Sequence, residues 1–224
     1  MKTLFVLDDE GRIISTREPE ATRGPLFGLV RSAASCAGAI RADVPTDLAS
    51  ELARLARDVP PTFNLRDAPV HAERYLSLLS GRIAPSEMAV TKTRQSDGPA
   101  FEFPDSLAPS ADVVVVEDER LLQHNFRGWV PGEIDAGRAP VLSIFENGYP
   151  VSICFCARRS EVAAEAGLDT AEAYRGRGYG PSVTAAWALV IRTSGRIPLY
   201  RTSWTNQASL AVARKLSLEA YASS

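Results

Sequence analysis

The sequence has little of what disulfide-linked and metal-binding proteins depend on. Its 224 residues include two histidines and three cysteines, and Cys36, Cys154 and Cys156 are odd in number and irregular in spacing. Such a set makes no disulfide framework, so we expect buried, small hydrophobic cysteine side chains in a reducing, cytoplasmic setting. Neither His71 nor His124 lies near a cluster of other ligand residues, which argues against a metal site.

An excess of one charge and long apolar runs are also missing. Lys and Arg total 25 and Asp and Glu total 27, so the formal net charge is −2. The basic excess typical of nucleic-acid-binding proteins is therefore absent. No window approaches the ~18 apolar residues that span a bilayer, and the first residues lack the apolar region of a signal peptide. We expect a globular protein with no nucleic-acid partner and no membrane partner.

The two halves of the chain differ in proline content and in how regular their predicted helices and strands are. Ten of the fifteen prolines lie at or before Pro109, and residues 1–100 are interpreted as an accessory region. Its patterns predict a strand, turn and strand near residues 4–14, a helix over about 47–58 and a second helix over about 67–81. No chemical motif occurs in this region, so we expect it to shape the substrate pocket or a dimer surface.

Residues 101–224 are more regular and are interpreted as the catalytic domain. Short helices are expected near residues 118–125 and Glu133. Strands are expected at 113–116, 141–145, 151–156, 163–170 and 197–204, and the Asn147-Gly148 pair predicts a tight hairpin. A helix follows residue 180 and another begins after Asn206. The order β-β-β-α-β-α predicts an α/β protein of the α+β type with a mixed central sheet.

The strongest chemical signal is a glycine-rich turn that joins a strand to a helix, Arg175-Gly176-Arg177-Gly178-Tyr179-Gly180. Glycines allow close approach of backbone N–H groups to a ligand, and a helix N-terminus favours phosphate. The two arginines add charged donors. The turn is no Walker A loop, because no Gly-Lys-Ser/Thr follows, and no dinucleotide fingerprint, because Pro181 stands where that motif needs glycine. It is interpreted as a pyrophosphate cradle.

The pattern Arg-x-x-Gly-x-Gly at the start of an amphipathic helix resembles the acyl-CoA-binding motif of the GNAT superfamily of N-acetyltransferases. The segments 202–209 and 213–216 resemble that superfamily's next strand and helix. The resemblance covers roughly half the chain, from about Val113 onward, and implies acetyl-CoA as cosubstrate and no metal. It also implies a splayed pair of central strands, with CoA contacts from Leu168, Asp169, Thr170, Asn206 and Ser209.

The resemblance also suggests catalytic groups. Glu165, on the strand before the cradle, occupies a place where members of the superfamily carry a glutamate base, and Asp169 and Glu161 compete for that role. A carboxylate suits it because an alkylammonium must lose a proton before it attacks. The superfamily's usual helix tyrosine is replaced by Ala213, so Tyr221 is the alternative acid. The superfamily's last strand is expected to be missing or very short.

The acceptor is expected to be a primary amine of a small molecule, with aminoglycoside-type antibiotics, and hence antibiotic resistance, or amino acids as options. Candidate acceptor-pocket residues are Phe126, Trp129, Glu133, Asp135 and Trp204. Two alternatives stay open: a CoA-binding module without catalysis, and an acetyltransferase acting on a protein N-terminus or lysine. A homodimer is a further option for the assembly.

Overall fold

The computed structural model describes residues 1–80, 98–109 and 112–223. The helix end expected at Gly81 lies outside these ranges. In chain order the strands are β1 (Phe5–Leu7), β2 (Ile13–Thr16), β3 (Phe27–Ser32), β4 (Cys36–Ile40), β5 (Pro99–Glu102), β6 (Val114–Val115), β7 (Leu142–Glu146), β8 (Tyr149–Arg159), β9 (Ala163–Thr170), β10 (Ile197–Arg201) and β11 (Glu219–Ser223). The helices are α1 (Thr46–Arg57), α2 (Ala72–Ser80), α4 (Tyr179–Thr193) and α5 (Gln207–Lys215), with short helical turns η1 (Glu119–His124), η2 (Ile134–Arg138) and η3 (Glu172–Tyr174).

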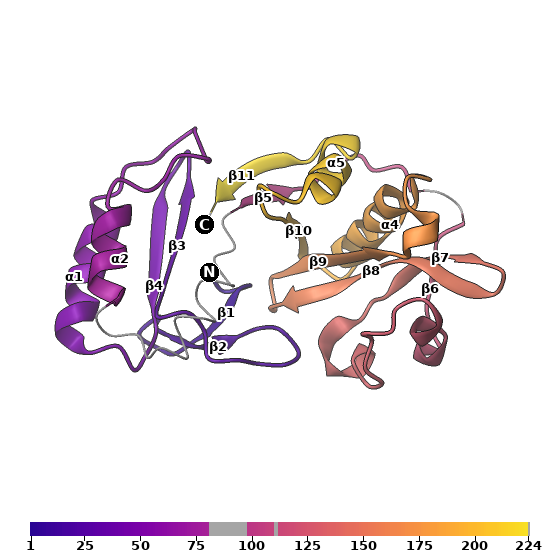
Figure 1. The fold of residues 1–224 in the computed structure, drawn as a ribbon, viewed down its shortest axis with the longest axis horizontal. Helices are drawn as coiled ribbons and strands as arrows, with labels where there is room; N and C mark the ends of the chain where they lie inside the picture. The colour runs from indigo at the N-terminus through magenta and orange to yellow at the C-terminus, as the bar shows by residue number, and fades with distance from the viewer. Residues whose placement is uncertain (81–97, 110–111, 224) are drawn as a thin grey trace.

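One long sheet runs through the molecule (Figure 1), and its described strands follow the order β4-β3-β11-β5-β10-β9-β8-β7-β6. Within it, β9 and β10 pair in parallel and the other described pairs are antiparallel. The order β7-β8-β9-α4-β10-α5 and the mixed sheet confirm the predicted fold class. The parallel pair requires a crossover connection, which the α4 segment supplies.

The hairpin between β7 and β8 shows how local sequence sets this fold. Asn147 and Gly148 adopt positive φ values of 52° and 82°, as a two-residue hairpin turn requires. The returning strand β8 then alternates its side chains between the two faces of the sheet. Cys154 and Cys156 belong to the cluster packed against α4, while Ile153 belongs to a cluster with η1 on the opposite face.

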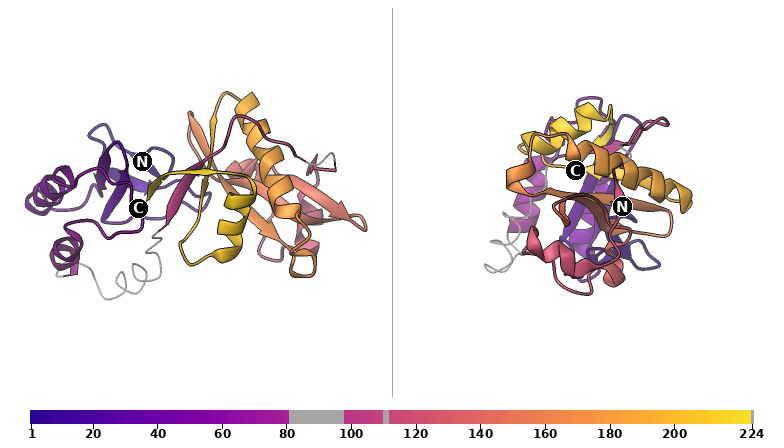
Figure 2. Two further views of the ribbon diagram at one scale, coloured as in Figure 1. Left: turned by 90° about the horizontal axis from the view of Figure 1, so that it is seen from above. Right: turned by 90° about the vertical axis from the view of Figure 1, so that its right-hand side faces the viewer.

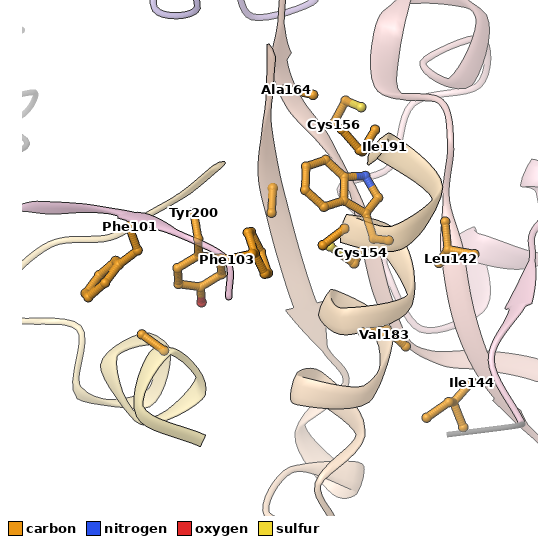
Figure 3. Close-up of a cluster of buried hydrophobic side chains, with 14 of the residues drawn as sticks. Phe101, Phe103, Leu142, Ile144, Cys154, Cys156, Ala164, Val183, Ile191 and Tyr200 are labelled. Atoms are coloured by element: carbon orange, nitrogen blue, oxygen red, sulfur yellow. The ribbon is translucent and has the colours of Figure 1, made fainter. Parts of the chain in front are cut away.

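The main core lies between α4, α5 and the sheet (Figure 3). Trp187 is fully buried among residues of β8, with Val183 and Ile191 on the same side of α4. The rings of Phe103 and Tyr200 belong to the same cluster, and their centroids lie 6.5 Å apart. Burial of side chains of this size contributes roughly 1.5–3 kcal/mol each. This core fixes α4, and therefore the loop at its start, against the sheet.

The first 80 residues form a lobe at one end of the long axis (Figure 2). Helices α1 and α2 pack on β3 and β4 around a separate cluster that includes Leu52 and Tyr75, and α1 and α2 confirm the two predicted helices. The strands β3 and β4 were not predicted. The last strand, β11, pairs with β3 on one side and with β5 on the other. Strands from the predicted accessory region and from the predicted catalytic domain therefore share one sheet.

Two expectations about strands need correction. The strand expected at 113–116 is reduced to the two residues of β6, and it lies at the edge of the sheet, where Val114 and Val115 are 48% and 53% exposed. The final strand, expected to be missing or very short, is present as β11. Five residues, Glu219–Ser223, suffice for β11 because it is inserted between two partners and so has backbone neighbours on both edges.

The sequence also predicted the absence of disulfides, of a metal site and of a membrane-spanning helix. In the described ranges, Cys154 and Cys156 are buried and Cys36 is half-buried, each with a free thiol. Those ranges contain no group of three or more His, Cys, Asp or Glu side chains placed to hold a metal ion. None of the helices in the described chain is both long enough and apolar enough to cross a bilayer.

Candidate active site

The site begins where β9 and β10 separate. These parallel strands pair only over Ala163–Glu165 and Ile197–Leu199, although β9 continues to Thr170. Beyond Glu165 one edge of β9 pairs with β8, and no described strand pairs with the other edge. An open strand edge presents backbone N–H and C=O groups that can bind an extended, amide-containing ligand. The expected splayed pair of strands is therefore present.

A cleft of about 860 Å³ occupies this opening. Its walls contain Glu165, most of the predicted cofactor-binding residues and several that were not predicted. The predicted ones are Leu168, Asp169, Thr170, Arg175, Gly176, Gly178, Tyr179, Gly180, Asn206 and Ser209. Arg177 lies beside the cleft, in a smaller hollow that it shares with Gly178 and Tyr179. The structure thus brings together residues from β9, the glycine-rich loop and α5.

The glycine-rich loop ends at the N-terminus of α4. Gly176 and Gly178 have φ values of +80° and +86°, a left-handed conformation that other residues adopt only with strain. No side chain caps α4 within the described structure, whereas α5 is capped. The first N–H groups of α4, those of Tyr179 and Gly180, are therefore without a partner from their own helix, and both residues line the cleft. This geometry fits the predicted phosphate cradle.

The two arginines of the loop are held by backbone carbonyls. Arg175 Nε donates to the carbonyl oxygen of Thr170 at 3.0 Å, and Arg177 Nη2 donates to that of Ala173 at 3.2 Å. The Arg177 guanidinium also lies over the Tyr174 ring, 4.9 Å from its centroid. A guanidinium has five N–H donors, so each arginine retains donors for a phosphate after these bonds.

Asn206 and Ser209 line the opposite wall, at the start of α5. The Asn206 side-chain oxygen accepts from the Ser209 backbone N–H at 3.0 Å, which caps the helix. The Ser209 hydroxyl lies 2.6 Å from the hydroxyl of Tyr200. Burial raises the pKa of Tyr200 to about 12, so its hydroxyl keeps its proton and can support Ser209 by hydrogen bonding.

Glu165 lies at the closed end of the opening and is 7% exposed. Its Oε1 accepts from Arg158 Nη1 at 2.5 Å, and the same guanidinium donates through Nε to Glu18 Oε1 at 2.7 Å. Burial alone would lower the pKa of Arg158, but the charges and hydrogen bonds of Glu165 and Glu18 raise it. The carboxylate expected to act as base is therefore one of two that share an arginine.

Tyr221 lies on β11, which β5 and β10 separate from the strand of Glu165, β9. The pKa of its phenol is raised, first by burial and then by the negative charge of Glu165. Tyr221 is 38% exposed and does not line the cleft. The structure thus places the two predicted catalytic residues on strands that are not neighbours, and leaves the tyrosine outside the cleft that would hold the thioester.

The predicted acceptor residues are not gathered in this cleft. Phe126 and Trp129 are each 6% exposed and pack with η1 against the face of the sheet opposite to α4. Glu133 forms an ion pair with Arg138 at 3.1 Å, and Asp135 lies exposed on η2. Their assignment to the acceptor pocket is not supported by the structure, because the two aromatic rings serve as core and Glu133 is already paired.

Trp204 lies beside the cleft rather than in it. Its neighbours Ser203 and Asn206 line the cleft, while its ring lies under the guanidinium of Arg66, 4.5 Å from the ring centroid. Arg66 belongs to the first 80 residues. The contact therefore joins the accessory region to the loop after β10, a structural role that the sequence alone did not suggest.

Several residues of the site were missed. Arg158, Tyr200, Arg201 and Lys215 line the cleft without having been singled out, and Glu18 reaches it through Arg158. Tyr200 was detectable in principle, since it directly follows Leu199, the last residue of β10 that pairs with β9, in a strand rich in β-forming residues. Glu18 carried no such signal, because 140 positions of sequence separate it from its partner.

No protein-family model matches the chain, and no curated protein matches it. Solved structures do. A GNAT-family acetyltransferase from Colwellia psychrerythraea has a TM-score of 0.50 and 12% identity over 97% of this chain and 77% of that one. A GCN5-related N-acetyltransferase-like protein from Streptococcus suis has a TM-score of 0.47 and 15% identity over 89% and 83% of the two chains.

A protein from Novosphingobium aromaticivorans assigned to the GNAT family has a TM-score of 0.47 and 16% identity. That match covers 57% of this chain and 62% of the other, less than two thirds of its length. At such identities the similarity concerns the fold alone. With the Colwellia structure as reference, the chain has the mixed α+β fold of GNAT acetyltransferases, as the sequence motifs predicted.

Proposed function

We propose that the protein is an acetyl-CoA-dependent N-acetyltransferase that acts on a primary amine of a small molecule. The observation that carries the proposal is the cleft between the separated strands β9 and β10, which leads directly to the uncapped, glycine-lined N-terminus of α4. An open strand edge suits the amides of pantetheine, and the helix start suits pyrophosphate. One continuous cleft thus offers a strand edge for the pantetheine arm and, next to it, a helix N-terminus for the pyrophosphate, in the order in which these parts are joined in CoA.

The chain's own residues supply the remaining parts of the reaction. Glu165 accepts a proton from the acceptor ammonium, so that the free amine attacks the thioester carbonyl. The new C–N bond forms as the C–S bond breaks, and the products are an amide, the CoA thiol and one proton released to solvent. Backbone groups of β9 and the start of α4 position the cosubstrate, which accounts for much of the rate advantage of a bound pair.

The test is release of free CoA thiol when the purified protein is mixed with acetyl-CoA and single amines. The panel contains aminoglycosides, amino acids, simple diamines and a peptide with a free N-terminus and a lysine. We expect turnover with at least one small amine, at a rate above that with the peptide. Binding of CoA without turnover of any amine would favour the non-catalytic module, and peptide as the preferred acceptor would favour a protein acetyltransferase.

A further inference from the structure

An arginine lies beside the carboxylate that must accept a proton in the proposed reaction. Arg158 Nη1 lies 2.5 Å from Glu165 Oε1. A guanidinium at that distance stabilises the ionised carboxylate and so weakens it as a proton acceptor. A base held by an arginine alone would therefore suit the proposed reaction poorly.

Glu18 changes this balance. Its Oε1 accepts from Arg158 Nε at 2.7 Å and lies 2.5 Å from Nη2. Burial alone would raise the pKa of Glu18, but hydrogen bonds from Thr16 and Arg158 outweigh it and lower the pKa. Glu18 is thus an anion at neutral pH. The positive charge of Arg158 is divided between two carboxylates.

Other elements also place charged groups near Glu165. After burial, the negative charge of Glu165 raises the pKa of the Tyr221 phenol on β11, on which Arg201 of β10 and Glu102 of β5 also act. The amino group of Met1 is also affected by these charges. Burial lowers the pKa of that amine, Arg201 lowers it further and Glu165 opposes both. Of these groups, only Arg158 forms a described ion pair with Glu165.

The geometry points to Glu18 as a positioning residue of the active site. It lies in the accessory region and acts through Arg158, holding the guanidinium in place and preserving the ability of Glu165 to accept a proton. This inference rests on the proposed function for its meaning in catalysis. It gives residues 1–80 a role at the reaction centre, in addition to their packing against β11.

The experiment measures the titration of the Glu165 carboxyl by ¹³C NMR in protein with labelled glutamate side chains, with the signal assigned by Glu165→Gln. In Glu18→Gln the positive charge of Arg158 acts on Glu165 alone. We expect the titration midpoint to move to lower pH by about one unit. Glu18→Asp keeps the charge and should restore most of the wild-type midpoint. Glu20→Gln removes an exposed carboxylate two residues away and should leave it unchanged.

The same variants are assayed with the best acceptor amine. For Glu18→Gln the acidic limb of the pH profile of kcat/KM should move with the NMR midpoint, and turnover at neutral pH should fall about 3- to 10-fold. The KM for acetyl-CoA should stay near the wild-type value. Glu18→Ser, which removes both charge and bulk, replaces Glu18→Gln if that variant does not fold.

An unmoved Glu165 midpoint in the folded Glu18→Gln or Glu18→Ser protein would overturn the inference. So would a loss of turnover that follows a lower melting temperature while the acidic limb stays in place, because that pattern describes a structural ion pair. If the wild type acetylates no amine, the proposed function fails, and the NMR titration still decides whether Glu18 controls Glu165.

Discussion

Glu165 and Leu199 are the last residues that β9 and β10 hold side by side before the two strands separate. The candidate base therefore stands at the closed end of the opening. Strand pairing on one side of Glu165 fixes its backbone, and the cleft begins on the other side. Its position is set by the sheet rather than by a mobile loop, as the alignment of a proton acceptor with a bound amine requires.

The first prediction concerns Gly178, the residue that precedes the first turn of α4 and has a φ of +86°. A Cβ added there would meet no atom within 4 Å, so it would project into open space at the cradle. Gly178→Ala should weaken CoA binding at least tenfold by calorimetry, with a stability loss of about 1–2 kcal/mol from the left-handed backbone. Gly148→Ala is the matched control.

Gly148 has a φ of +82° in the β7–β8 hairpin and equally open surroundings. Its alanine variant should lose similar stability and bind CoA like the wild type. Equal CoA affinities for the two alanine variants would show that the α4 N-terminus is not the phosphate cradle.

The second prediction concerns Glu165. If it accepts the proton of the ammonium, Glu165→Gln should lower turnover by about 10²–10⁴-fold and leave CoA affinity nearly unchanged. Activity should recover in part at high pH, where the amine is already neutral. Asp169→Asn tests the competing carboxylate in the cleft wall, and Glu161→Gln is the control because Glu161 is exposed. A larger loss in Asp169→Asn than in Glu165→Gln would transfer the role to Asp169.

The third prediction concerns Tyr221. Because its side chain does not line the cleft, it cannot hold the geometry that protonation of the thiolate requires. Tyr221→Phe should therefore keep turnover within about threefold of the wild type, with a small change in melting temperature. The assay is steady-state turnover together with thermal unfolding of the same sample. A loss of well over tenfold at an unchanged melting temperature would restore Tyr221 as the acid.

The parts of this site that could be read from the sequence are those fixed by neighbouring residues. The strand Ala163–Thr170, the glycine-rich turn and the cap at Asn206 each depend on a short stretch whose spacing or backbone preference is visible in the sequence. Asn206 was correctly expected to begin a helix, because an N-cap needs only an acceptor side chain and the N–H three residues later.

The parts that could not be read depend on contacts between distant segments. Gly28 interrupts β3 and Gly38 interrupts β4, which also has mostly short side chains, so the strand pattern is weak in the sequence. Both strands gain stability from contacts with distant segments, β11 and α1. Phe126 and Trp129 could equally have lined a pocket or filled a core, because an aromatic side chain suits both environments. Only the packing of η1 on the sheet distinguishes the two.

The last prediction concerns the dependence of stability on pH. Tyr200 is 2% exposed, and burial is the main reason why its pKa rises to about 12, while the hydrogen bond with Ser209 opposes the shift. The unfolded chain binds its tyrosine protons up to a pKa of about 10. The folded state holds the proton more tightly, so the contribution of Tyr200 to stability is complete below pH 10 and is lost as the pH rises from 10 to 12. A shift of two pKa units corresponds to about 2–3 kcal/mol in the free energy of unfolding.

Denaturant unfolding at about pH 8 and about pH 11.5 should show a smaller loss of stability for Tyr200→Phe than for the wild type, by roughly that amount. Burial also raises the pKa of Tyr75 to about 12. Tyr75 should therefore account for part of the loss of stability that persists in the Tyr200→Phe variant. Identical pH-dependent losses in the two proteins would show that the Tyr200 hydroxyl is not held protonated in the folded core.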